Sequence, residues 1–257
     1  MPSECGCWNN NYRSKEFYML SEAASRANPV TQHKTLIHRL KQPIVKLIGR
    51  ERANRLAAPY YNWQARRRTT AFLAALPESA LYVNLGCGYR PMRGWINVDQ
   101  ARGPEVQVVW DLRCGLPFRS ESCFAIFSEH LIEHVSKDDT QNLLRECYRV
   151  LQSGGVLRLS TPDAEKFLRS YIGDGEFLRH PNFSRPIDAP IDRVNEMMRE
   201  QGQHLWSYDA ELLTLMLKRA GFPAITRQSF GVSLHERMRD IDFGARAFES
   251  LYIEAVK

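Results

Sequence analysis

The sequence has no apolar run of the roughly 18 residues that a membrane-spanning helix needs, and its first thirty residues hold charges such as Arg13, Lys15 and Glu16 where a secretory signal has an apolar core. It has no CxxC pair. The nearest two of its six cysteines, Cys5 and Cys7, fit neither a redox motif nor a zinc knuckle. These absences predict a cytoplasmic protein with reduced thiols.

Acidic residues are scarce at the N-terminal end. Residues 1–70 hold 13 Lys and Arg against 4 Asp and Glu, a net charge of +9, whereas residues 71–257 hold 22 against 25, a net charge of −3. Apolar residues from His33 to about Leu56 recur at steps of three and four, which predicts a basic amphipathic helix with a kink at Pro43. This helix either packs on the domain with its charges solvated or binds a partner. An anionic membrane surface, an acidic substrate and nucleic acid are the partners considered.

Short apolar runs alternate with helical patterns from residue 78 onward, which predicts an α/β fold with a mostly parallel sheet. The domain is expected at 78–257, after a basic helical extension at 1–77, with a proline-containing, lid-like insertion at about 173–203. Strands are expected at Leu81–Leu85, Trp95–Val98, Val106–Trp110, Cys123–Phe127, Val156–Leu159, Ile225–Phe230 and Leu251–Val256. Helices are expected at about Tyr61–Leu76, at Ser136–Leu151, where Ser136 and Asp139 form a capping box, and at Tyr208–Ala220.

A glycine turn and two acidic residues follow three of these strands. Gly86 and Gly88 let the backbone approach a ligand closely after the first strand. Asp99, at the end of the second strand, is suited to accept hydrogen bonds from both hydroxyls of a ribose. Asp111, at the end of the third, is placed to accept one from the amino group of an adenine. Ligands of open α/β sheets bind at this edge, so the pattern predicts a site for an adenosine-containing ligand.

Two common nucleotide sites lack their sequence signals. The NAD fingerprint needs a third glycine where this chain has Pro91, and no GxxxxGK[ST] phosphate loop occurs. Because both signals are absent, NAD and nucleoside triphosphates are disfavoured as ligands of this site.

Several segments resemble the class I S-adenosylmethionine-dependent methyltransferases, in the group with a methyltransferase-11-type domain. They are VNLGCG (83–88), GWINVD (94–99), DLRCGLPF (111–118), FSEHLIEH (127–134), ECYRVLQSGGVL (146–157) and LSTPD (159–163), with HLWSYD (204–209), LMLKRAGF (215–222) and ESLYIEAVK (249–257) in the tail. The resemblance covers about two thirds of the chain. It implies a Rossmann-like sheet of seven strands with helices on both faces and an antiparallel last strand.

The resemblance also implies which residues bind S-adenosylmethionine. Gly86 and Gly88 would line its methionine portion, Asp99 its ribose, and Asp111 with Leu112 its adenine. Asn84 is assigned to the cofactor site as well, and Ser128, at the end of the fourth strand, would face the sulfonium.

His130, Glu133 and His134 follow the fourth strand directly and are the candidate catalytic residues. Their i, i+3, i+4 spacing places them on one face of a helix or turn. They would act as acid and base on a hydroxyl acceptor, bind a metal, or order the loop. Some relatives hold a divalent ion in a similar Glu-x-x-Glu-His cluster. His130 in place of the first Glu makes Zn²⁺ a better fit than Mg²⁺.

The sequence leaves open which molecule accepts the methyl group. Relatives with GWINVD after the glycine turn resemble predicted methyltransferases of polysaccharide or secondary-metabolite pathways, so a hydroxyl of a sugar, a glycolipid or another small molecule is expected. A scaffold that binds the cofactor without catalysis is one alternative, and RNA methylation through the basic segment is another. The position after the fourth strand reads Ser128-Glu129-His130, without a base-methylating motif. His204 and Tyr208 would close over the acceptor or simply begin a helix, with Trp206 anchored in the core.

Overall fold

The computed structural model describes residues 63, 64 and 66–257 of the chain. Residues 68–257 form one compact unit. The basic helix expected from His33 to about Leu56 lies outside the described residues, and the domain boundary near residue 77 stays a prediction.

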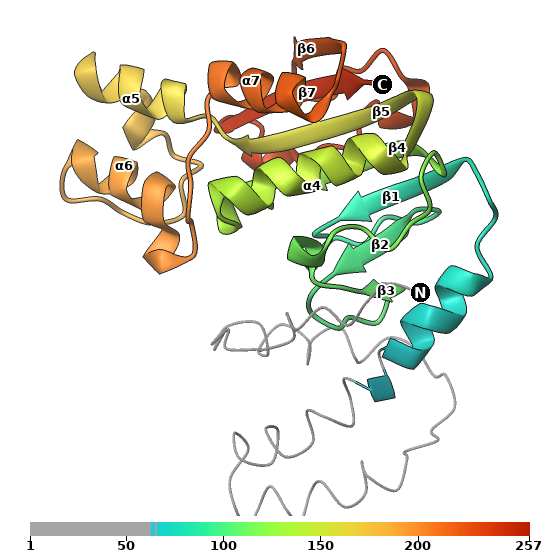
Figure 1. The fold of residues 1–257 in the computed structure, drawn as a ribbon. Helices are drawn as coiled ribbons and strands as arrows, with labels where there is room; N and C mark the ends of the chain where they lie inside the picture. Colours follow the sequence, from blue (N-terminus) through green and yellow to red (C-terminus); the bar gives the residue numbers. More distant parts are fainter. Residues whose placement is uncertain (1–62, 65) are drawn as a thin grey trace, which may run out of the picture. The chain divides into compact units, whose positions relative to one another are not determined.

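Seven strands form one sheet in the order β3-β2-β1-β4-β5-β7-β6 (Figure 1). Neighbouring strands in the part β3-β2-β1-β4-β5 run parallel to each other, and β7 is antiparallel to both of its neighbours, β5 and β6. This confirms the predicted Rossmann-like sheet with its antiparallel last strand. The strands are β1 (Leu81–Leu85), β2 (Ile96–Asp99), β3 (Val108–Val109), β4 (Cys123–Glu129), β5 (Leu151–Pro162), β6 (Ala224–Gln228) and β7 (Ser250–Val256).

Helices α4 (Lys137–Val150) and α7 (Ala210–Ala220) lie side by side on one face of the sheet (Figure 1). The main core is between them and the sheet, and Phe72 and Leu73 of the helix that leads to β1 pack against it. The predicted capping box of α4 is present, because the Ser136 hydroxyl accepts from the Asp139 N–H and donates to the Asp139 carboxylate.

The opposite face is covered by the segment 229–249, which contains the short 3₁₀ helices η5 (Glu236–Met238) and η6 (Gly244–Arg246). Met238 of this segment packs on Ala125 and Val156, which belong to the strands. Successive side chains of a strand point to opposite faces. Arg158, two residues after Val156 on β5, therefore points to the same side.

Arg158 is fully buried there and carries the main ionic contact of the unit. Its guanidinium donates to Asp242 and to Glu254 of β7, with N···O distances of 2.8 Å each for the Nε and Nη1 bonds. It also donates to the carbonyl oxygens of Ser229 and Val232. One side chain thus joins β5, β7 and the covering segment.

Two elements differ from the sequence prediction. β5 begins at Leu151 and runs through Gly154 and Gly155, where a break was expected, because the two glycines exchange backbone hydrogen bonds with Lys257 at the end of the chain. Helix α5 (Ala164–Ile172) was not predicted. The Asp163 carboxylate caps it by accepting from the Lys166 N–H.

The insertion at 173–203 is more regular than its prolines suggested. It contains the 3₁₀ helices η3 (Phe177–Arg179) and η4 (Glu200–Gly202) and the α-helix α6 (Pro190–Arg199). Pro190 occupies the first helical position, where its missing N–H costs no hydrogen bond, so this proline starts a helix instead of marking a loop. A small core of its own joins the insertion to α5 through Phe167, Leu178 and Val194.

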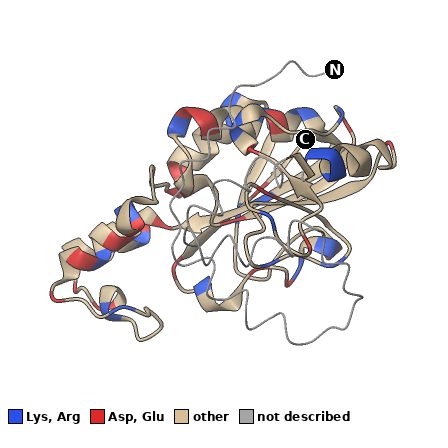
Figure 2. Cartoon of the chain, turned by 90° about the horizontal axis from the view of Figure 1, so that it is seen from below, with Lys and Arg blue, Asp and Glu red and all other residues tan. Residues whose placement is uncertain are grey.

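Both signs of charge are distributed along the helices of the described part (Figure 2). No described helix is both long enough and apolar enough to cross a membrane.

Replacing Arg158 by Ala is expected to lower the free energy of unfolding by about 3–5 kcal/mol, because Asp242 and Glu254 would stay buried without a counter-charge. Urea unfolding followed by circular dichroism measures this loss. Arg169→Ala is the matched control: Arg169 is 78% exposed in its pair with Glu165, so about 1 kcal/mol or less is expected. Equal losses in the two variants would contradict the central role of Arg158.

Candidate functional site

The glycine turn follows β1 at the carboxyl edge of the sheet. The N–H groups of Gly86 and Cys87 both donate to the Val98 carbonyl at the end of β2. Gly86 and Gly88 have φ angles of +65° and +50°, a region that disfavours residues with a Cβ. A Cβ at Gly86 would lie 2.6 Å from Leu131, whereas a Cβ at Gly88 would meet no atom within 4 Å. Gly88 therefore leaves open space beside the turn, which fits a bound ligand.

Asp99 faces this turn from the end of β2. Its carboxylate accepts from the Gly88 N–H at 2.8 Å and from the Ala101 N–H at 2.7 Å. Burial raises the pKa of Asp99, although these hydrogen bonds oppose the rise. Each carboxylate oxygen keeps a further lone pair, so the group can still accept from two ribose hydroxyls.

Asn84 is buried under the turn. Its amide donates to the Arg90 carbonyl at 3.1 Å and to the Asn97 side chain at 3.0 Å. These bonds hold residues 86–90 against β2. The structure thus gives Asn84 a positioning role, and its contact with the cofactor stays a prediction.

Asp111 and Leu112 lie after β3, where both are buried. The Asp111 carboxylate caps the 3₁₀ helix η1 (Leu112–Cys114) by accepting from the Arg113 N–H. It also forms a bidentate pair with the Arg113 guanidinium, whose closest N···O distance is 2.7 Å. An adenine amino group at this position would share the carboxylate with Arg113.

Ser128 and Glu129 end β4 at the centre of the same edge. The Ser128 hydroxyl is buried without a hydrogen-bond partner in the described part of the chain. Glu129 pairs with Arg90 of the glycine turn at 2.6 Å and accepts from the Phe243 N–H at 2.8 Å. An orphaned hydroxyl here and open space at Gly88 both fit a polar ligand along this edge.

His130 follows β4 in the left-handed region, with φ at +47°, which is strained for a residue other than glycine. Its Nε2 lies 2.7 Å from the Ser250 hydroxyl of β7. Its Nδ1 lies 3.1 Å from a Glu133 carboxylate oxygen, but not in the alignment of a hydrogen bond. With a side chain that is 5% exposed, His130 is held by its neighbours and is not free at the surface.

Glu133 and His134 belong to the 3₁₀ helix η2 (Ile132–His134). Glu133 stays beside His130, whereas His134 turns toward His204, so the three side chains do not share the single face that was predicted. Glu133 is 1% exposed, and one of its oxygens accepts from the Thr161 hydroxyl. Burial alone would raise the pKa of Glu133, but His130 and His134 outweigh it and lower the pKa to about 2. The carboxylate is therefore a buried negative charge.

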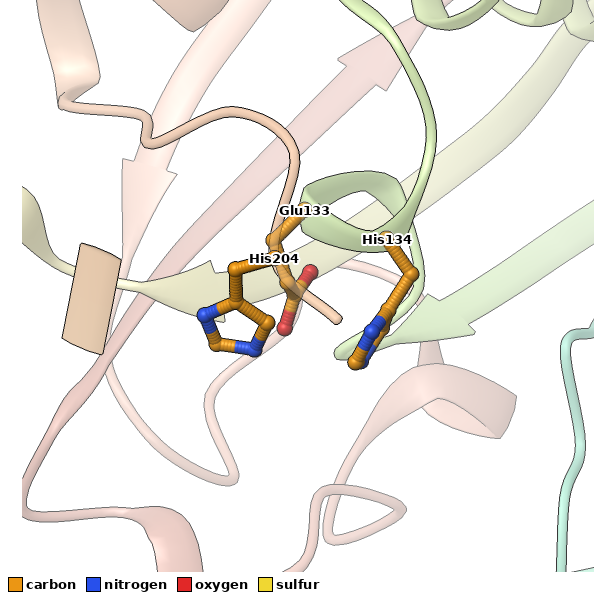
Figure 3. Close-up of side chains that lie close together, drawn as sticks. All are labelled: Glu133, His134 and His204. Carbon is orange, nitrogen blue, oxygen red and sulfur yellow. The ribbon is translucent and has the colours of Figure 1, made fainter. Parts of the chain in front are cut away.

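His134 lies instead beside His204, which follows the insertion (Figure 3). Their ring centroids are 4.8 Å apart. Burial lowers the pKa of His134. Burial opposes protonation of His204 too, but its hydrogen bond with Glu200 raises the pKa of that ring. Among the described residues, Glu133, His134 and His204 are the group that could hold a metal ion, with ligand atoms within 4.8 Å of one another.

A cavity of about 270 Å³ opens beside His130, between the insertion and the segment 229–249. Its walls combine aromatic rings with charged groups. Among the lining residues are Phe167, Phe183, Phe243, Phe248, Arg185, Arg193, Arg246, Glu196, Glu200, His204 and Glu249. A more open hollow of about 670 Å³ is lined by residues 192–204 alone, away from the glycine turn.

Glu249 and Arg246 were not predicted from the sequence. Both line the cavity, and within the described chain neither side chain has a hydrogen bond or an ion pair. Burial raises the pKa of Glu249, against the opposing effect of His130. Glu249 begins the segment ESLYIEAVK (249–257), but the resemblance gave it no role; the position of both residues at η6 and before β7 is what brings them to the cavity.

His204 lines the cavity, as a residue that closes over the acceptor would, but Tyr208 and Trp206 lie elsewhere than predicted. The Tyr208 ring is fully buried and its hydroxyl donates to the Thr140 side chain, so it does not reach the cavity. Trp206 is 41% exposed under the Lys137 ammonium and does not anchor the core.

The comparisons with known proteins find methyltransferases. Residues 83–159 match a methyltransferase domain family. A segment of 68 residues is 44% identical to malonyl-[acyl-carrier protein] O-methyltransferase 1 of Coxiella burnetii; it covers 26% of this chain and 23% of that relative. The chain thus matches less than a quarter of that relative's length.

Two solved structures are similar. One is an S-adenosylmethionine-dependent methyltransferase of Mesorhizobium loti, with TM-score 0.41, 19% identity and coverage of 73% of this chain and 96% of that chain. The other is phosphoethanolamine N-methyltransferase 2 of Haemonchus contortus in complex with S-adenosylmethionine, with TM-score 0.42, 17% identity and coverage of 76% and 52%. Residues 83–159 thus carry a methyltransferase domain, and the sheet around them has the strand order expected from the resemblance to class I S-adenosylmethionine-dependent methyltransferases.

Proposed function

We propose that this protein transfers the methyl group of S-adenosylmethionine to an oxygen of a small acceptor, and that a sugar or glycolipid hydroxyl is that oxygen. The cavity of about 270 Å³ carries the proposal. It opens beside His130, two residues after Ser128, at the edge of the sheet that also carries the glycine turn and Asp99. An acceptor in this cavity would lie next to the methionine end of the cofactor.

The cofactor supplies a methyl group on a sulfonium, which is already a good leaving group. The protein's own residues then have to align the acceptor and exclude water. Gly86 and Gly88 shape the backbone around the cofactor, and the Arg90–Glu129 pair holds that turn against the end of β4. Phe243 closes the other side of the same pair, because the Arg90 guanidinium lies 3.8 Å from its ring centroid.

Glu249 is the best placed group to take the acceptor's proton. His130, the residue predicted for this role, has Nε2 engaged with Ser250 and Nδ1 beside Glu133. The Glu249 carboxylate faces the cavity without a partner in the described chain, and burial raises its pKa toward the range that suits a general base. The Arg246 guanidinium, also unpaired there, would bind a polar group of the acceptor.

The matched relative supports an oxygen acceptor, since its name records an O-methyltransferase. The match is confined to 68 residues, whereas the lining of the cavity runs from His130 to Glu249, so the match cannot include all of it. The acceptor therefore follows here from the cavity and not from the relative.

Calorimetry with S-adenosylmethionine and S-adenosylhomocysteine is the first experiment, and binding of both is expected. Cofactor labelled in its methyl group is then incubated with a panel of monosaccharides, glycolipids, a malonyl thioester and RNA, and label is expected in a sugar or glycolipid. Absence of cofactor binding would overturn the proposal. Binding without transfer to any acceptor favours a scaffold. Label in RNA, with salt-dependent binding that weakens when Arg66, Arg67 and Arg68 become Ala, favours the RNA alternative.

Asp99→Ala is expected to weaken cofactor binding by about 1.5–3 kcal/mol, or roughly tenfold to 150-fold, because the ribose would lose a charged acceptor. Calorimetry measures the change. Asp138→Ala, at an exposed position in the first turn of α4, is the matched control and should bind as the wild type does. Unchanged binding by Asp99→Ala would show that the ribose lies elsewhere.

Glu249→Gln is expected to lower kcat by about 10²–10⁴-fold with little change in KM, because the acceptor would lose its proton-accepting group. In the wild type, the rate should fall as the pH drops through the pKa of Glu249, and burial places that fall above the range of an exposed carboxylate. The variant should lose this acidic limb. Glu211→Gln, on an exposed turn of α7, is the control. A rise in KM alone would assign Glu249 to binding.

A further inference from the structure

Glu133, His134 and His204 come together from two segments that are distant in the sequence (Figure 3). Glu133 and His134 lie in η2, directly after the central strand, whereas His204 follows η4 at the end of the insertion. Backbone hydrogen bonds fix the two segments to each other, since the Leu205 N–H donates to the Glu133 carbonyl at 2.7 Å. The cluster is therefore part of the folded framework.

Glu133 presents an unsatisfied charge to this cluster. Its carboxylate is 1% exposed, and Thr161 donates to one oxygen. The other oxygen is buried without an aligned hydrogen bond from any described residue, although His130 Nδ1 lies 3.1 Å from it. A buried anion with an open oxygen is costly unless a positive group faces it.

His204 directs its Nε2 into the same space. Its Nδ1 lies 2.6 Å from the Met197 carbonyl, which can only accept, so Nδ1 carries the hydrogen. In a neutral ring, Nε2 then has a lone pair, and it faces a Glu200 carboxylate oxygen at 2.9 Å. Two acceptors at this distance need a proton or a cation that both can bind.

The hydrogen bond from His204 Nδ1 to the Met197 carbonyl is also of the kind that orients a metal-binding histidine. A histidine that binds a metal usually donates its second ring N–H to a carbonyl or carboxylate, which fixes the tautomer. Adjacent ligands on a tetrahedral ion with bonds of about 2.0–2.2 Å lie about 3.3–3.6 Å apart, so the 2.9 Å between His204 Nε2 and the Glu200 oxygen would widen slightly when an ion binds. The Glu200 oxygen lies 3.9 Å from His134 Nε2, so it also faces the second imidazole.

We propose that Glu133, His134, His204 and Glu200 form a binding site for one Zn²⁺-class divalent ion. Two imidazoles and two carboxylates suit zinc and related transition metals, whereas magnesium prefers an all-oxygen site. His130 lies outside this group of ligand atoms, and its Nε2 is bound to Ser250. The proposed ligand set thus leaves out His130 and adds Glu200 and His204, which lie outside residues 130–134.

The ion would lie beside the cavity that is proposed for the methyl acceptor. Glu200 and His204 line the cavity of about 270 Å³, so the ion would sit in its wall. A divalent ion there supplies Lewis acidity toward an acceptor oxygen. Because its ligands come from η2 and from the end of the insertion, the ion would also fasten the insertion to the sheet. The metal site is independent of the proposed methyl transfer, since metal binding is measured without acceptor or cofactor.

The experiment uses the full chain after treatment with a chelator. Calorimetry with ZnCl₂ is expected to give one strong site per chain, and the melting temperature should rise with zinc concentration, as for any ligand that binds the folded state. Addition of Co²⁺ should produce visible absorption without the thiolate charge-transfer band that a cysteine site would give. Mg²⁺ should bind far more weakly.

His204→Ala and Glu200→Gln are the diagnostic variants, and circular dichroism shows whether each is folded. Loss of a ligand should weaken zinc binding by more than the roughly tenfold to hundredfold that loss of an outer partner costs. His180→Ala, another histidine of the insertion, which stacks on Phe248, is the matched control and should keep the affinity of the wild type. Glu200→Gln is expected to disturb folding less than His204→Ala, because the Glu200 side chain is 36% exposed.

Three results would overturn the site: no zinc binding, a thiolate band with Co²⁺, or wild-type affinity in both diagnostic variants. Magnesium binding as tight as zinc would overturn the assigned class of ion. Zinc binding without any binding of S-adenosylmethionine would leave this site standing and overturn the proposed function, so the two failures are distinguishable.

Discussion

The parallel pairing of β4 between β1 and β5 determines where every candidate functional group lies. Leu85 pairs with Ser128, and Ser128 pairs with Leu159, so three strands end at one edge of the sheet. The glycine turn, Glu129 and His130 leave the sheet from those ends. A shift of one residue in this register would turn each side chain to the opposite face. Burial of alternate residues on both faces prevents such a shift.

The buried charge of Arg158 connects this sheet to the cavity. Arg158 holds Asp242 and the carbonyls of Ser229 and Val232, and the same segment continues to Phe243, whose N–H donates to Glu129. The cavity wall formed by residues 243–249 is thus fixed at one end by an ion pair and at the other by β7. A cavity built this way is held rigid by the core, which suits a reaction that depends on alignment.

Much of the sheet could be predicted from the sequence because its signals are local. The apolar runs of β1 and β4, the cap at Ser136 and the turn at Gly86 each depend on neighbours within a few residues. Asp99 follows from the same reasoning, since parallel strands end at one edge. β5 was cut short because its glycines pair with the end of the chain, and no local pattern shows such a partner.

The groups around the cavity could not be predicted for the same reason. No local pattern in the sequence distinguishes Glu249 and Glu200 from other acidic residues. Their proposed roles depend on segments that only the fold brings together. The 130–134 motif shows the limit most clearly. Its spacing implies one shared face, but the left-handed backbone at His130 turns that ring toward Ser250, while His134 turns toward His204. The motif is therefore divided: His130 is bound to Ser250 of β7, Glu133 lies between His130 and Thr161 of β5, and His134 faces Glu200 and His204 at the end of the insertion.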